Sequence, residues 1–183
     1  LSDALTWTFD GVFQARDLSG EAPQYYFRGL TSVPRPIAGD IDNGVPGTYY
    51  DTRSSLLSTA LDWQINCAWK ASLSYGVTTS WNDVNKIFAY IDSPNGDYDV
   101  NVYELGGKSE WKLAQAQVQG SFRTGRLAHQ LVAGLSHQTG LGWDRPYEWN
   151  LIGRANLYQR SPLRHDAVGS RVMSRGDETV QTA

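Results

Sequence analysis

The sequence has few of the features that mark a disulfide-stabilised, helical-membrane or nucleic-acid-binding protein. Its 183 residues include one cysteine, Cys67, so no disulfide bond can form within the chain. No apolar run approaches the roughly 18 residues that a transmembrane helix needs, which excludes a helical membrane protein but not a membrane β-barrel. The formal net charge of −3 gives no electrostatic footprint of nucleic-acid binding, so nucleic acid is not an expected partner.

The two ends of the sequence lack the usual boundary signals. The first residue is Leu1, and no basic-then-apolar leader of the secretory kind follows it. The last residues, 178–183, do not have the character of a terminal strand. We therefore expect the chain to be an internal piece of a longer polypeptide.

Patterns for catalysis or metal binding are also scarce. No serine lies in a nucleophile elbow, and no glycine-rich phosphate loop is present. The three histidines are at positions 129, 137 and 165, which favours interface and loop positions over a shared metal site. Asp92, Asn95 and Asp97 could offer oxygen ligands to calcium, but their spacing is ordinary turn chemistry. We predict that the chain is not an enzyme and holds no metal of its own.

Aromatic residues and regular alternation are plentiful instead. The chain has seven tryptophans and ten tyrosines, many for a soluble domain. In the segments 57–65 and 69–79, apolar and polar residues alternate with period two, which predicts strands with one apolar and one polar face. Trp63 and Trp69 lie on either side of the short link 66–68, as in the aromatic girdle of an outer-membrane barrel.

The same alternation predicts five strands along the chain. They cover residues 5–15, 57–65, 69–79 with an extension through 91, 98–122, and 127–139. Long glycine- and proline-bearing loops are expected near 16–47, 80–97 and 140–170. Short turns are expected at 66–68 and 124–126. Bacterial barrels have short periplasmic turns and long extracellular loops, so the three long segments are predicted to be extracellular.

Several short segments resemble TonB-dependent siderophore receptors. Residues 7–20 resemble a barrel strand that runs into an extracellular loop, and Tyr49–Thr52 followed by Leu61–Gln64 resembles the next strand. The sharpest similarity is the hairpin Gly120–Gly125 with His129–Gly134, and Asn95–Tyr98 is similar to a hairpin tip of that family. The resemblance covers residues 5–139 well and the rest loosely.

The resemblance implies an all-β fold, an antiparallel up-and-down transmembrane β-barrel segment. Residues 1–183 would form part of the wall of a plugged barrel of about 22 strands in the bacterial outer membrane. Such receptors bind a ferric siderophore outside the cell and import it with energy passed on by TonB. The plug, the segment that contacts TonB and the closing strands would lie outside this chain, whose few strands cannot close a barrel of at least about eight.

Aromatic residues of the predicted outer loops, together with one arginine, are the candidates for ligand binding. Aromatic rings offer apolar area with a polar handle, and arginine can donate paired hydrogen bonds to oxygen groups of a bulky chelate. The candidates are Tyr25, Tyr26, Phe27, Trp81, Phe88, Tyr90, Trp143, Arg145, Tyr147 and Trp149. The same residues could instead pack loops together or contact lipopolysaccharide and outer-membrane lipid. Iron would be held by the siderophore, so no cofactor is expected.

Three other functions remain open at this stage. The same barrel could carry another nutrient, such as a vitamin or a sugar. An outer-membrane barrel enzyme would need a set of catalytic residues, Ser/His/Asp or Asp/His, at the extracellular ends of the strands. Of the candidate residues, only His137 is near such an end. A soluble β-sandwich binding module would also show alternation, although it does not need such regular loop asymmetry.

Overall fold

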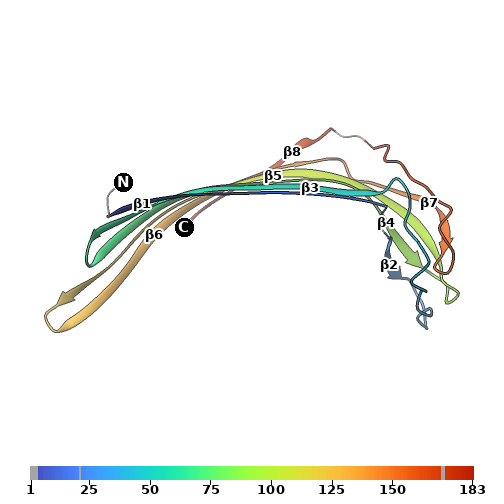
Figure 1. Cartoon of the computed structure of the whole chain (residues 1–183), viewed down its shortest axis with the longest axis horizontal. Coiled ribbons are helices and arrows are strands. Elements are labelled where there is room, and N and C mark those ends of the chain that lie inside the picture. Colours follow the sequence, from blue (N-terminus) through green and yellow to red (C-terminus); the bar gives the residue numbers. More distant parts are fainter. Residues whose placement is uncertain (1–3, 21, 170–171) are drawn as a thin grey trace.

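The computed structural model describes residues 4–20, 22–169 and 172–183, and all regular structure in this part of the chain is β. The strands form one sheet in the order β1-β3-β4-β5-β6-β8, with β2 paired to β4 and β7 paired to β5 (Figure 1). Their bounds are β1 Leu5–Ser19, β2 Gln24–Phe27, β3 Tyr49–Asn66, β4 Trp69–Ile91, β5 Asp97–Thr124, β6 Leu127–Asp144, β7 Glu148–Asn156 and β8 Ser174–Thr182. The described residues contain no helix that could span a membrane.

The sheet is an antiparallel up-and-down wall, which confirms the predicted fold class. Consecutive long strands pair without a register shift over most of their length, as in β4 and β5 from Trp69↔Gly120 to Ile91↔Tyr98. Among the strands of the described residues, only β2 pairs in parallel. The order of the sheet runs from β1 to β8 without returning to β1, so the sheet is open.

The alternation places the apolar residues on one face, as predicted. Leu61 lies opposite Leu73, Leu73 opposite Ala116, and Ala116 opposite Leu135, so one apolar row crosses four strands. Leu73 is 57% exposed, and Phe9 and Trp7 on β1 are exposed to a similar extent. An apolar face that is left open over this length requires an apolar environment or a covering partner.

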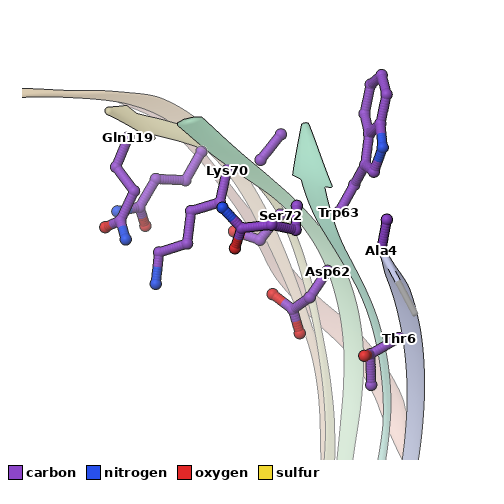
Figure 2. A pocket seen from close by; sticks show the side chains of 10 residues that line it. Ala4, Thr6, Asp62, Trp63, Lys70, Ser72 and Gln119 are labelled. Atoms are coloured by element: carbon purple, nitrogen blue, oxygen red, sulfur yellow. The ribbon is translucent and has the colours of Figure 1, made fainter. Parts of the chain in front are cut away.

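The opposite face of the same strands is polar. Asp62, Ser72 and Gln117 form one of its rows, and Gln64, Lys70 and Gln119 form the next. These side chains line a shallow hollow on the inside of the sheet's curve, whereas Trp63 points to the other side (Figure 2). The polar face is therefore concave here.

The strands are longer than the sequence predicts. β1 continues to Ser19. β4 runs to Ile91, as the predicted extension of that strand has it, so most of the segment 80–97, which was also expected to be a loop, is strand. The predicted loop 16–47 contains β2, and the predicted loop 140–170 contains the end of β6 and all of β7. The 28 residues of β5 would extend over about 90 Å, far beyond the roughly 9–11 residues that cross a bilayer.

The far ends of β4 and β5 form a second structural unit with β2 and β7, which we call the distal sheet. It lies at the opposite end of the molecule from the β3–β4 and β5–β6 turns (Figure 1). Its outer side is the continuation of the apolar face, and segments near 45 and 157–163 cover it. The buried core consists of Val45, Ile87, Ala89, Ile91, Tyr98, Val100, Val102 and Leu157. This packing gives the ends of the strands a fixed shape.

Candidate ligand-binding site

Aromatic side chains gather on the inner side of the distal sheet. Register is continuous along β4, so Phe88 and Tyr90 lie on the same face as Ser72 and Lys70. Tyr26 of β2 pairs with Tyr90, and Trp149 of β7 pairs with Tyr103 of β5. We call this surface the distal aromatic face; it consists of Tyr26, Phe88, Tyr90, Tyr103, Tyr147 and Trp149.

The rings of the distal aromatic face contact one another. Phe88 meets Tyr103 edge-on with 4.3 Å between ring centroids, and Tyr26 stacks on Tyr90 at 5.5 Å. Tyr147 and Trp149 lie 5.6 Å and 6.3 Å from Tyr103. Such tilted and edge-on pairs are favourable geometries for aromatic groups. Their outermost members, Tyr147 and Trp149, are 60% and 52% exposed, so a ligand can reach them.

Two hydroxyl groups give this face a polar centre. The Tyr90 and Tyr103 hydroxyls lie 3.0 Å apart and share a hydrogen bond. Burial, together with the neighbouring Tyr90 and Tyr147 hydroxyls, raises the pKa of Tyr103 above its ordinary value. Tyr103 therefore stays a neutral phenol at physiological pH and can donate a hydrogen bond to a ligand oxygen.

Cationic groups border the distal aromatic face. The Arg28 guanidinium lies 4.6 Å from the Tyr90 ring centroid, and the Lys86 ammonium lies 4.5 Å from that of Phe88. Arg154 is already occupied, because it forms ion pairs with Asp92 at 2.7 Å and with Asp99 at 2.8 Å. The hydrogen bonds that Arg154 donates hold the pKa of the Asp92 carboxyl group below its usual range. This border can attract anionic and oxygen-rich groups.

Half of the predicted ligand-binding residues lie on this surface. The structure brings together Tyr26, Phe88, Tyr90, Tyr147 and Trp149, which come from three strands and one connection. The sequence reasoning missed Tyr103, Arg28 and Lys86. The alternation of Lys86, Phe88 and Tyr90 within the predicted extension of this strand to 91 indicates the face they share, but a long loop was expected over the same segment 80–97.

Two predicted residues turn away from this surface and serve the fold. Tyr25 points into the distal core, where its ring meets that of Tyr98 edge-on at 5.5 Å, and burial raises its pKa. The Arg145 side chain is 3% exposed and forms an ion pair with Asp83 at 2.7 Å. Both side chains are engaged within the fold in this conformation, so neither enters the proposed site.

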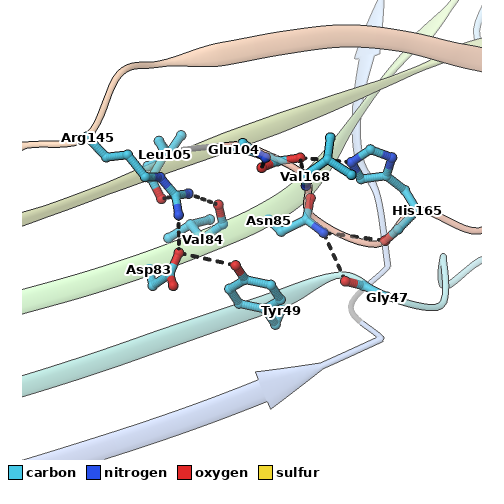
Figure 3. A network of polar contacts seen from close by, with 11 residues as sticks. Gly47, Tyr49, Asp83, Val84, Asn85, Glu104, Leu105, Arg145, His165 and Val168 are labelled. Atoms are coloured by element: carbon cyan, nitrogen blue, oxygen red, sulfur yellow. Dashed lines mark hydrogen bonds and ion pairs between the residues drawn. The ribbon is translucent and has the colours of Figure 1, made fainter. Parts of the chain in front are cut away.

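Arg145 belongs to a buried polar network between the long strands and the distal core (Figure 3). Its guanidinium also donates to the backbone carbonyls of Leu105, at 2.7 Å, and Val84. Nearby, the Glu104 carboxylate accepts hydrogen bonds from His165 and from the Val168 and Gly169 backbone N–H groups. Burial alone would raise the pKa of Glu104, but these hydrogen bonds hold it below its ordinary value. The network fixes segment 165–169 to the outer side of the sheet.

The remaining three predicted residues lie away from the distal aromatic face. Phe27 occupies the opposite side of β2 from Tyr26 and is 57% exposed. Trp81 and Trp143 belong to a row on the apolar face, with the Arg53 guanidinium 5.9 Å from the first ring and the Lys108 ammonium 5.0 Å from the second. Tryptophans with neighbouring cations at one end of an apolar band have the arrangement of an interfacial girdle. Within the described ranges, no group of three or more His, Cys, Asp or Glu residues could hold a metal ion.

Comparison with known proteins gives a match in structure only. No family model matches the chain, and no curated protein matches its sequence. The ferric preacinetobactin receptor BauA from Acinetobacter baumannii matches all of the chain with a TM-score of 0.79 and 16% identity. The closed form of the ferric-catecholate import receptor Fiu from K12 E. coli matches 97% of the chain with a TM-score of 0.65 and 14% identity.

The matches define the fold as a section of a β-barrel wall like those of the two matched proteins. The chain spans 28% of the length of BauA and 27% of the length of Fiu. Both are described as receptors and neither as an enzyme.

Proposed function

We propose that the chain is part of an outer-membrane receptor that binds ferric siderophores and imports them with TonB-derived energy. The observation that carries the proposal is the distal aromatic face, which continues the polar, inward-curving face of the sheet. In a closed barrel this face surrounds the lumen, so the aromatic rings line a vestibule above it. The likeness in fold to two ferric-chelate receptors supports the cargo class.

The apolar face then contacts the lipid of the outer membrane. Trp69 and Trp81 are twelve residues apart on β4, which at about 3.3 Å per residue and a tilt of about 40° corresponds to roughly 30 Å across the bilayer. This height is close to the apolar band of about 25 Å that barrels present. The row that includes Trp81 and Trp143 would lie at the outer interface, near lipopolysaccharide.

The receptor needs no cofactor in this part. Iron enters as cargo, bound by its chelator, and the residues of the distal aromatic face contact the chelator. Contact with TonB belongs to the plug, outside this chain.

Transport is tested by uptake of a radioactive ferric chelate into iron-starved cells, which should stop in a strain that lacks TonB. Binding of a vitamin or a sugar, with no competition by any ferric chelate, would favour that other cargo.

Removing the exposed rings should weaken chelate binding and leave the barrel intact. We expect the triple variant Tyr26→Ala, Tyr147→Ala, Trp149→Ala to lose about 2 kcal/mol or more of binding free energy, because aromatic anchors dominate many interfaces. Equilibrium binding of the ferric chelate to the purified receptor measures the loss. The matched control is Trp81→Ala with Trp143→Ala, on the opposite face. An unchanged affinity in the triple variant would remove this surface from the site.

The orientation in the membrane can be tested with single cysteines. Cys67 is exposed in the short β3–β4 turn, and Pro94 is exposed at the β4–β5 tip. In a receptor without other cysteines, we expect a membrane-impermeant maleimide to label Cys67 only after the outer membrane is permeabilised. The variant Cys67→Ser, Pro94→Cys should be labelled on intact cells, since hairpin tips face solvent. Labelling of Cys67 on intact cells would contradict this topology.

A further inference from the structure

The apolar face changes character on the last strands of the sheet. Leu57 and Val77 lie opposite each other in one row of this face. The same row continues into Lys112 of β5, Thr139 of β6 and Val180 of β8. We call the changed area the polar flank; it consists of Glu110, Lys112, His137, Thr139, Glu178 and Thr182. The face is therefore charged on β5 and β8 at the level where β3 and β4 have the uncharged segments 55–59 and 75–79.

The charges of the polar flank lie in two short ion pairs. The Lys112 ammonium lies 2.8 Å from the Glu110 carboxylate, and the Arg175 guanidinium, at the edge of the flank, lies 3.1 Å from the Glu178 carboxylate. The Lys112 and Glu178 side chains remain 48% and 53% exposed. Each ion pair therefore keeps an open side that can contact a further charged group.

These charges extend into the membrane band of the proposed receptor. Lys112 is four residues along β5 from Lys108, which lies opposite Trp143. At about 3.3 Å per residue and a tilt of about 40°, Lys112 lies roughly 10 Å below the tryptophan row. His137 is six residues along β6 from Trp143 and shares a hydrogen bond with Thr182 at 2.9 Å. Ionisable side chains in contact with lipid are costly, so such residues mark surfaces where a membrane protein contacts a partner.

The balance of charge indicates the kind of partner. Glu110 and Glu178 supply two carboxylates, and Lys112 and Arg175 supply two cations, so the two ion pairs are together neutral. An anionic lipid headgroup would be attracted by an excess of cations. Both signs side by side instead complement a second surface with the same pattern, as in a two-fold interface between identical subunits.

We propose that the polar flank is the contact between two copies of the receptor, related by a two-fold axis along the membrane normal that passes close to Thr139. Such an axis brings β5 of one copy opposite β8 of the other, because β6 lies between these strands in the sheet. Lys112 of each copy then meets Glu178 of the other, and both ion pairs are removed from lipid. This inference rests on the proposed function, since it requires the apolar face to lie in the membrane.

The test measures association of the purified whole receptor in a mild detergent by analytical ultracentrifugation. We expect a dimer that dissociates on dilution. The double variant Glu110→Leu, Lys112→Val removes both members of one ion pair, so it leaves no lone charge behind. It should raise the dissociation constant of the dimer about tenfold or more. Lys112→Glu places like charges opposite each other across the axis and should weaken association further.

The matched control is the double variant Val77→Leu, Thr79→Leu, which changes the same two rows on β4. This variant should associate like the unchanged receptor. Chelate binding should be the same in all these variants, because none of the positions lies on the distal aromatic face. A receptor that binds a ferric chelate but stays monomeric at every concentration would overturn the interface alone. A receptor that dimerises but binds no ferric chelate would overturn the proposed function alone.

Cross-linking tests the same contact in the membrane. In a receptor without other cysteines, the variant Thr139→Cys, Cys67→Ser is treated with a short bis-maleimide in isolated outer membranes. We expect a product of twice the receptor's mass, since the axis places the two cysteines close together. The variant Thr79→Cys, Cys67→Ser should not give this product. Cross-linking of position 139 only to a different protein, or no cross-linked product at all, would overturn the proposal.

Discussion

Replacing Arg145 with alanine is expected to destabilise the junction between the long strands and the distal sheet by about 3–5 kcal/mol, the range for breaking a buried ion pair. The Arg145 guanidinium connects three groups on two strands, which are the Asp83 carboxylate and the carbonyls of Val84 and Leu105. Its removal leaves buried polar groups without this donor. Hydrogen exchange of residues 83–85, 104–106 and 165–169 should rise, while exchange in residues 70–77 should not.

The chain contains a matched control for this prediction. Arg154 forms equally short ion pairs with two aspartates, but its side chain is 53% exposed. Solvent screens exposed pairs, so Arg154→Ala should change stability far less than Arg145→Ala. Arg145→Lys keeps the charge but loses the fork of donors, so it should fall between the two. Equal effects of Arg145→Ala and Arg154→Ala would show that burial does not set the strength of the pair.

The fold was largely predictable because the sheet follows a simple rule. Alternation with period two assigns the faces of Leu61, Leu73 and Ser72 correctly without any knowledge of pairing. Two of the strands that were missed, β2 and β8, lack this signal. β2 has only four residues and pairs in parallel, and β8 is mostly polar, so both depend on backbone hydrogen bonds to a neighbouring strand. Glycine- and proline-rich composition also led us to place loops where strands continue.

The candidate site was predictable in residue type but not in arrangement. Aromatic residues near loop ends can point to a ligand, to lipid or to a core, and the sequence does not distinguish these environments. Tyr25 and Tyr26 are adjacent, yet one packs on Tyr98 in the core and the other on Tyr90 on the inner face. Arg145 was selected because arginine binds oxygen groups, and it does so here, but with the protein's own carboxylate and carbonyls.

The apolar and polar faces should respond in opposite ways to a new charge. Leu73 and Ser72 are neighbours on β4, so their side chains leave the same strand in opposite directions. Leu73→Arg places a guanidinium on the apolar face close to the middle of the proposed membrane band, and we expect a cost of about 2–4 kcal/mol. Ser72→Arg places the same group beside Asp62 and Gln117 on the polar face, where water and a carboxylate can receive it.

The two arginine variants also separate a barrel from a soluble sheet. Leu73 is 57% exposed, so in water an arginine there would be tolerated, because exposed positions rarely contribute more than about 0.5 kcal/mol. In lipid, the new arginine side chain has no polar or charged partner, so the substitution should reduce assembly of the receptor in the outer membrane. Heat-modifiable migration and urea titration of the whole receptor measure the difference. Leu73→Arg should unfold at a clearly lower urea concentration than Ser72→Arg, whereas equal midpoints would mean that the apolar face does not contact lipid.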